Sequence, residues 1–181
     1  MNRQLDVLFI HPNASKKIYQ DLSNDYSAIE PPIWAAMLAQ HCRSNGFGSQ
    51  ILDCEAERLN YIEAAQVIKD VNPRIACFVV YGQQPSASTQ NMHGAVGLAD
   101  ELKKIAPNLR TLFVGGHVAA LPRETLKEPS IDMICQNEGV YTISGLLSIN
   151  NLDDQSQISK VKGLGYKVDG MPVLNEPSII V

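Results

Sequence analysis

The chain has 181 residues, of which 45% are hydrophobic and 19% are charged. This length fits one sizeable domain, and the composition is that of a globular protein with a core. The formal net charge is −4 and no long basic run occurs, which argues against nucleic-acid binding through clustered lysines and arginines. No apolar run approaches the roughly 18 residues needed to span a bilayer, so no membrane association is expected.

The four cysteines, Cys42, Cys54, Cys77 and Cys135, are widely and irregularly spaced. None of them forms the CxxC or CxxxCxxC spacing of zinc and iron–sulfur sites. Three lie within or beside apolar segments, where cysteine behaves as a small hydrophobic residue. Together with a polar amino terminus that has no signal peptide, these features predict structural free thiols in a reducing cytoplasm.

The amino-terminal part alternates short apolar runs with longer periodic segments. Residues 6–10 predict a strand buried on both faces, and the long polar loop 11–30 after it is typical of a functional segment. A helix opened by its prolines spans about 31–45, followed by a strand at 50–53 and a helix at 61–70. The residues expected to face the core are Ile33, Met37, Leu38 and Cys42 in the first helix and Ile62, Ala65 and Ile68 in the second.

The next segments repeat this alternation. Residues 75–80 are the most apolar run, and a helix capped by Ser88 or Thr89 follows and ends near Lys104. The remaining expected elements are strands at 111–114 and 132–135 and helices at 119–126 and 140–149.

Five strand–helix repeats predict an α/β fold with a parallel five-stranded sheet and helices on both faces. We expect the flavodoxin-like (Rossmann-like) strand order 2-1-3-4-5. This order places a ligand over the carboxyl ends of the strands, near the switch point between the first and third strands. The domain is assigned to residues 1–150, and residues 151–181 are expected to form a polar linker and a C-terminal β-hairpin around an Asp-Gly turn.

Three classes of site occur at the strand ends of such a fold. A phosphoacceptor site needs clustered acids after the first strand, where this chain has His11-Pro-Asn. A flavin or dinucleotide site needs a phosphate-binding loop there, and segment 11–17 has no glycine. A corrinoid needs hydroxyls after the third strand and glycines after the fourth, which are present as Ser86, Ser88, Thr89 and the pair Gly115-Gly116.

Three segments carry a resemblance to a known family. They are Gly115-Gly-His-Val-Ala-Ala-Leu-Pro-Arg-Glu-Thr-Leu126, Ile131-Asp-Met-Ile-Cys-Gln-Asn-Glu-Gly139 and Val161-Lys-Gly-Leu-Gly-Tyr-Lys-Val-Asp-Gly170. In this order and spacing they resemble the N-terminal cobalamin-binding domain of cobalamin-dependent radical SAM enzymes, over essentially the whole chain. The resemblance implies a flavodoxin-like module that presents cobalamin to a radical SAM domain following residues 151–181 or supplied by a separate chain.

Two motifs of related proteins are absent from the sequence, DxHxxG and CxxxCxxC. The resemblance therefore implies base-off cobalamin without the DxHxxG histidine, and it places the iron–sulfur cluster and S-adenosylmethionine in a domain outside this chain. The chain alone is not expected to be catalytic. Its full-length parent is expected to be a methyltransferase, in which cobalt carries a methyl group from S-adenosylmethionine to a substrate radical. The alternative is a stand-alone corrinoid- or flavin-binding or sensing module with no catalytic partner.

The strand-end loops and the resemblance together give the expected cofactor contacts. No catalytic residue and no metal ligand is assigned, and His11 is the one candidate retained for the lower face of cobalt. His117 is expected to hydrogen-bond near the cofactor's nucleotide tail, His41 to be buried or at a boundary, and His93 to be solvated. Trp34 is expected in the core, or otherwise as a wall of the cofactor pocket. The assigned contacts are Pro12, Asn13, Ala14, Ser15, Tyr81, Gly82, Gln83, Gln84, Ser86, Ser88, Thr89, Gly115, Gly116, His117, Val118, Asn137, Glu138 and Gly139.

Overall fold

The computed structural model describes residues 4–13, 31–82 and 85–180. Within these ranges seven strands form one sheet, in the order β2-β1-β3-β4-β5-β6-β7. The first five are parallel neighbours, which confirms the predicted order 2-1-3-4-5. The strands are β1 (Val7–His11), β2 (Ser49–Asp53), β3 (Ile75–Val79), β4 (Arg110–Val114), β5 (Met133–Cys135), β6 (Leu164–Val168) and β7 (Met171–Leu174).

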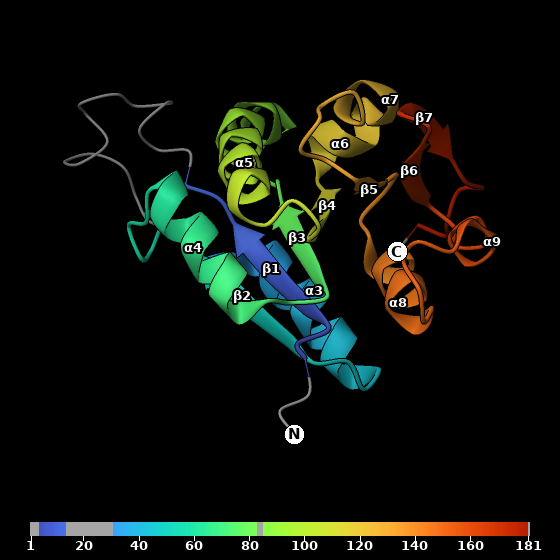
Figure 1. Cartoon of the computed structure of the whole chain (residues 1–181), viewed down its shortest axis with the longest axis horizontal. Coiled ribbons are helices and arrows are strands. Elements are labelled where there is room, and N and C mark those ends of the chain that lie inside the picture. Colours follow the sequence, from blue (N-terminus) through green and yellow to red (C-terminus); the bar gives the residue numbers. More distant parts are fainter. Residues whose placement is uncertain (1–3, 14–30, 83–84, 181) are drawn as a thin grey trace.

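Helices cover both faces of the sheet, as the strand–helix alternation predicted (Figure 1). α3 and α8 pack on one face, and α4 and α5 pack on the other. No helix in the described ranges is both long and apolar enough to cross a bilayer. The helices are α3 (Ile33–Ser44), α4 (Tyr61–Val71), α5 (Pro85–Ile105), α6 (Gly116–Ala120), α7 (Pro122–Thr125), α8 (Val140–Ser148) and α9 (Gln155–Ile158).

The strand count is seven and not five because the C-terminal hairpin joins the sheet. β6 pairs antiparallel with β5, and β7 pairs antiparallel with β6. Asp169 and Gly170 both have positive φ, 51° and 77°, which is the backbone of the predicted two-residue hairpin turn. Leu164 and Tyr166 of β6 are buried, so apolar burial adds to the backbone pairing. The predicted polar linker contains the short helix α9, capped by the side chain of Asp154.

The core has two layers because successive side chains of a strand point to opposite faces. In β1, Val7 and Phe9 join the cluster under α3 and α8, whereas Leu8 and Ile10 join the cluster under α4 and α5. All four are at most 2% exposed. Burial on both faces explains why the parallel strands read as continuous apolar runs.

Two helices begin earlier than predicted. α5 starts at Pro85, so Ser88 and Thr89 lie inside the helix and do not cap it. The segment predicted as one helix at 119–126 is two short helices, and the first, α6, begins directly after β4. Pro122 separates them because proline has no N–H to continue α6 but fits the first position of a new helix.

The predicted core face of α3 is partly wrong. Leu38 and Cys42 are buried, but Ile33 and Met37 are 60% and 59% exposed, and Trp34 is 41% exposed. At about 100° per residue, Ile33 and Met37 fall on the side of the helix opposite Cys42. The small residues Ala35 and Ala39 are buried beside Leu38 and Cys42 instead. On α4, Ile62 is likewise exposed (70%), whereas Ala65 and Ile68 are buried.

Candidate functional site

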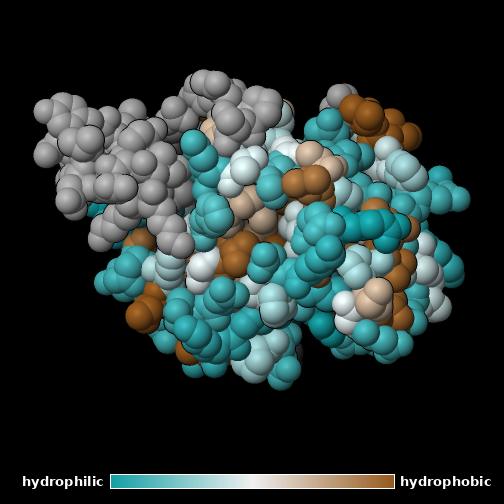
Figure 2. Space-filling view, turned by 90° about the horizontal axis from the view of Figure 1, so that it is seen from above, coloured by the Kyte–Doolittle hydropathy of each residue, from teal (hydrophilic) through white to brown (hydrophobic). Residues whose placement is uncertain are grey.

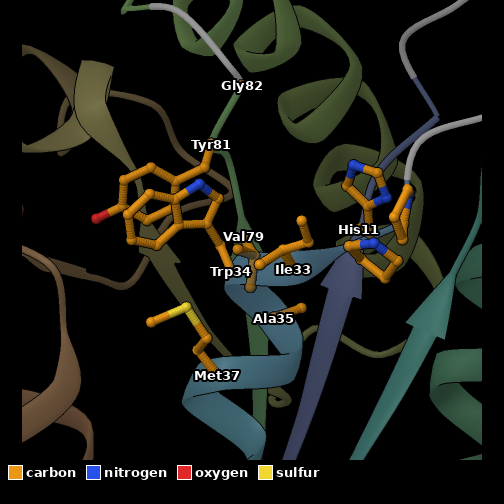
Figure 3. Close-up of a pocket in the computed structure, with 10 residues that line it drawn as sticks. His11, Ile33, Trp34, Ala35, Met37, Val79, Tyr81 and Gly82 are labelled. Atoms are coloured by element: carbon orange, nitrogen blue, oxygen red, sulfur yellow. The ribbon is translucent and has the colours of Figure 1, made fainter.

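A cavity of about 210 Å³ lies where β1 and β3 end, beside the start of α3. The strand order reverses between β1 and β3, so the cavity is at the switch point where this fold class binds ligands. Seen from above in Figure 2, apolar surface lies among polar residues near the middle of the molecule. The residues lining this cavity, called here the aromatic pocket, are His11, Pro31, Pro32, Ile33, Trp34, Ala35, Met37, Val79, Tyr81 and Gly82 (Figure 3).

One wall of the aromatic pocket is a stacked pair of rings, Trp34 of α3 and Tyr81, which follows β3 (Figure 3). The ring centroids are 4.4 Å apart and the planes differ by 19°. Burial raises the pKa of Tyr81, and the nearby Cys135 and Glu138 add to the rise, so the phenol stays protonated and able to donate a hydrogen bond. The exposed part of Trp34 offers a flat apolar surface to a ligand.

His11 faces the same pocket, across Ile33 from the stacked rings (Figure 3). It is the last residue of β1, and its partner in the neighbouring strand β2 is Asp53. His11 Nδ1 lies 3.3 Å from Asp53 Oδ1. The same carboxylate oxygen accepts hydrogen bonds from the backbone N–H groups of Glu55 (3.2 Å) and Ala56 (3.1 Å). The turn after β2 therefore fixes the carboxylate, and the carboxylate orients the imidazole.

The Gly-Gly pair after β4 belongs to the glycine loop, defined here as residues 115–118, of which 116–118 form the first turn of α6. A Cβ on Gly115 would lie 2.1 Å from the carbonyl oxygen of Val80, so only glycine fits the close approach of the two strand ends. Ser88 is 2% exposed; its hydroxyl donates to the Val80 carbonyl and accepts from the backbone N–H of His117 (2.9 Å). A Cβ on Gly116 would meet Ser88 only at ordinary contact distances, 3.6 and 3.7 Å. Packing within the described chain therefore requires Gly115 but does not require Gly116.

The side chains of the glycine loop are also engaged by the protein. His117 Nδ1 lies 3.1 Å from the hydroxyl of Thr89, and Val118 is fully buried in the cluster under α4 and α5. Of the contacts predicted here, Gly116 and Thr89 are exposed and His117 is half-buried. This part of the edge offers little side-chain surface for a ligand.

The segment after β5 provides a carboxylate near the aromatic pocket. Asn137 accepts from the backbone N–H of Gly139 (3.2 Å), and its amide nitrogen lies 3.4 Å from the carbonyl oxygens of Ser178 and Ile179. Gly139 begins α8 as its N-cap. Glu138 Oε2 is buried and has no hydrogen-bond partner among the described residues. A buried carboxylate oxygen without a partner is costly, so this oxygen can accept a hydrogen bond from any donor that reaches it.

Several predicted contacts lie outside the described residues. Ala14, Ser15, Gln83 and Gln84 fall outside the described residues, and the side chain of Ser86 is not described. Pro12 is buried and Asn13 is half-buried, directly after His11. Of the residues predicted to lie near the cofactor, His11, Tyr81 and Gly82 line the aromatic pocket, and so does Trp34, which was expected in the core or otherwise as a pocket wall.

The contribution of α3 to the site was only partly predicted. Ile33 and Met37 were expected in the core but line the pocket, whereas Trp34 forms a pocket wall, the second of the two positions expected for it. The signal was present, because the helix carries two apolar stripes: the buried stripe contains Leu38 and Cys42, and the second contains Ile33 and Met37. A helix that packs on one face of a sheet needs only one such stripe, so the second indicates a further contact.

The fold and the pocket define a ligand-binding α/β module of the flavodoxin-like class. The chain belongs to the B12-binding domain family, whose sequence model matches residues 21–147. It is 32% identical over 148 residues to the uncharacterized methyltransferase PH0819 of Pyrococcus horikoshii, an alignment that covers 81% of this chain and 30% of that protein.

Two solved structures share the fold at 14% sequence identity. The radical S-adenosylmethionine methyltransferase TsrM of Kitasatospora setae, with cobalamin and a [4Fe-4S] cluster bound, superposes with a TM-score of 0.72 over 99% of this chain and 30% of TsrM. The cobalamin-dependent S-adenosylmethionine radical enzyme OxsB, with aqua-cobalamin bound, superposes with a TM-score of 0.63 over 97% of this chain and 23% of OxsB. The chain thus spans about 30% of the curated methyltransferase and less than a third of either solved enzyme.

Proposed function

We propose that this chain holds cobalamin across the carboxyl-terminal edge of its sheet and acts as the cobalamin-carrying domain of a radical SAM methyltransferase. The observation that carries the proposal is the aromatic pocket at the switch point, in a chain of the B12-binding domain family. At about 210 Å³ the pocket is smaller than the roughly 300–1,000 Å³ of sites that enclose a drug-sized ligand. It would therefore receive part of the cofactor, and the remainder would lie over the exposed strand ends.

The residues present fit the chemistry of a corrinoid, which combines flat ring systems with amide side chains. Trp34 and Tyr81 offer aromatic surface to a ring. Glu138 Oε2, buried without a partner among the described residues, would accept a hydrogen bond from an amide N–H or a hydroxyl. Gly116 leaves the surface beside Ser88 open, where a side chain would take up space.

The glycine loop has a different role in this proposal. Gly115 and Ser88 tie the end of β3 to the start of α6 through Val80 and His117, and so keep the edge of the sheet in one shape. The loop therefore supports the site, whereas the aromatic pocket supplies most of the contact surface.

Bound cobalamin would supply a cobalt centre that accepts and releases a methyl group. This chain would bind and orient the cofactor and keep its lower face away from water. The iron–sulfur cluster and the S-adenosylmethionine site would belong to a radical SAM domain, in the same polypeptide or in a partner. We also propose that the cobalamin-binding domain comprises residues 1–150 and that residues 151–181 lead toward the radical SAM domain.

A flavin is the second candidate ligand, because a stacked Trp–Tyr pair at this edge also suits an isoalloxazine ring. The chain would then be a stand-alone binding or sensing module. The family match favours the corrinoid.

The test is reconstitution with hydroxocobalamin in the presence of equimolar flavin mononucleotide, followed by desalting and a visible spectrum. We expect corrin absorbance at about one cofactor per chain and no flavin absorbance. Retained flavin, or no retained chromophore from a chain that is folded by circular dichroism, would contradict the proposal. Methyl transfer requires the full-length protein, in which a methyl-labelled S-adenosylmethionine should pass its label to cobalamin held by this domain.

A further inference from the structure

We propose that residues 175–180, called here the C-terminal strap, position the carboxylate of Glu138 for the bound cofactor, and that Asn137 is the positioning residue that joins the two. This inference rests on the proposed function, because it needs cobalamin at the strand ends. It adds a coupling between the ligand site and residues outside the proposed 1–150 domain.

The two residues before Glu138 both bond to the C-terminal strap. Gln136 Nε2 donates to the carbonyl oxygen of Asn175 (3.0 Å). The amide nitrogen of Asn137 lies 3.4 Å from each of two further carbonyl oxygens of the strap. All three acceptors are backbone groups, so the strap holds the loop through its path and not through its side chains.

The C-terminal strap is itself anchored in the protein. The backbone N–H of Gly163, at the start of the hairpin, donates to the carbonyl oxygen of Glu176 (2.7 Å). The side-chain amide of Asn175 donates to the carbonyl oxygens of Ile158 (2.8 Å) and Val161 (2.9 Å). These bonds fix the first half of the strap without any contribution from a ligand.

The position of Glu138 depends on the loop that carries it, residues 136–139. Its Oε2 has no donor among the described residues, and its charge adds to the raised pKa of Tyr81, so the carboxylate lies near that phenol. The far end of the loop is fixed by packing, because Gly139 has a φ of 83° and a Cβ there would lie 2.8 Å from Val114. The near end is the one that the C-terminal strap holds.

Coupling of this kind is reciprocal. If the strap holds the loop where Glu138 can accept a hydrogen bond from the cofactor, then the bound cofactor must in turn hold the strap. The strap has little else to keep it closed at its far end, because Ile179 and Ile180 are 76% and 72% exposed. Hydrogen bonds in such an exposed segment open readily, so a change in their opening is measurable.

The experiment measures the affinity of the whole chain for hydroxocobalamin by equilibrium dialysis. In Asn137→Ser the hydroxyl can still accept from the backbone N–H of Gly139, as Asn137 does (3.2 Å), but it is too short to reach the strap. We expect this change to weaken binding about fivefold and Glu138→Ala to weaken it about tenfold. In the Glu138→Ala chain, Asn137→Ser should have almost no further effect, because both act through one contact.

The matched control is Asn151→Ser. Asn151 accepts a similar hydrogen bond from the backbone N–H of Asp153 (2.9 Å), outside the loop and the strap, so its affinity should equal that of the wild type. Hydrogen–deuterium exchange gives a second readout that a purely structural role of Asn137 would not produce. Hydroxocobalamin should slow the exchange of the strap amides about fivefold in the wild type and leave it unchanged in Asn137→Ser.

The outcomes separate the two proposals. Additive losses from Asn137→Ser and Glu138→Ala, wild-type affinity in either single variant, an equal loss in Asn151→Ser, or strap exchange that is unchanged in a chain retaining cobalamin would each overturn the inference and leave cobalamin binding intact. Failure of the folded wild-type chain to retain cobalamin would overturn the proposed function, and the inference with it.

Discussion

The two sides of the carboxyl-terminal edge differ in how much of their polar chemistry is already used. In the glycine loop, the Ser88 hydroxyl joins Val80 to His117, and His117 contacts Thr89. In the aromatic pocket, Trp34 is 41% exposed, and Nε2 of His11 has no hydrogen-bond partner among the described residues. The glycine loop is satisfied by the protein itself, whereas the aromatic pocket has surface left for a ligand.

This difference shows that a recognisable motif need not be the main contact surface. The Gly-Gly pair stands out in the sequence, yet packing against Val80 accounts for Gly115. The aromatic pocket has no motif and arises from parts far apart in the sequence, His11, Trp34 and Tyr81. Changes on the two sides should therefore affect different quantities.

The largest expected effect is on stability, from Gly115→Ala. Its Cβ would overlap the Val80 carbonyl oxygen at 2.1 Å, and because both are backbone positions neither can rotate away. We expect a loss of about 3 kcal/mol in the free energy of unfolding, at the upper end for overpacking. The measurement is urea unfolding followed by circular dichroism.

Gly116→Ala is the matched control, because its Cβ meets Ser88 at 3.6 Å or more. Its unfolding free energy should change by at most about 0.5 kcal/mol, whereas its cobalamin affinity should fall. Equal destabilisation by the two changes would show that close packing does not distinguish these glycines.

The parallel order of the first five strands was predictable, because helices alternate with doubly buried strands such as 75–80, whose apolar runs are easily recognised. The hairpin turn was predictable from Asp169-Gly170, but its attachment to β5 was not, since pairing depends on the burial of Leu164 and Tyr166 by distant residues. The His11–Asp53 contact could not be predicted from the sequence either, because it depends on the parallel register of β1 and β2.

Trp34→Ala removes the exposed half of the stacked pair. A ring that stacks on an aromatic side chain gains about 0.5–1.5 kcal/mol in addition to the free energy of burying its apolar surface. Because the cofactor would lose this contact, we expect cobalamin affinity to fall about tenfold. Stability should also fall, by about 1 kcal/mol, because the stack on Tyr81 is lost. Equilibrium dialysis measures the affinity.

Ile62→Ala is the control for this change, because Ile62 is also an exposed apolar helix residue (70%), on α4 and outside the aromatic pocket. Its cobalamin affinity should equal that of the wild type. A similar loss of cobalamin affinity from both changes would show that the aromatic pocket does not contribute specifically to cobalamin binding.

A separate effect, on the pH dependence of stability, concerns the cysteines, which are free and buried as predicted. Burial raises the pKa of Cys42 to about 11 and that of Cys54 to about 12. The unfolded chain loses these thiol protons at lower pH than the folded chain, so stability is unaffected below about pH 8.5 and falls as pH rises above it. Urea midpoints at pH 7.5 and 10 should show the decrease.

Cys54→Ala should reduce this alkaline decrease, because it removes one of the raised thiol pKa values. A midpoint that rises between pH 7.5 and 10 would contradict the buried state of the thiols. Iodoacetamide should modify the thiols slowly in the folded chain and rapidly in urea.

Trp34 is the only tryptophan in the chain, so its fluorescence directly tests whether cobalamin lies against the aromatic pocket. The measurement is a titration of the chain with hydroxocobalamin, following tryptophan emission after correction for cofactor absorbance. We predict saturable quenching that ends at one cofactor per chain, in step with the corrin absorbance retained after desalting. Stoichiometric retention of cobalamin with unchanged Trp34 emission would place the cofactor elsewhere and contradict the account.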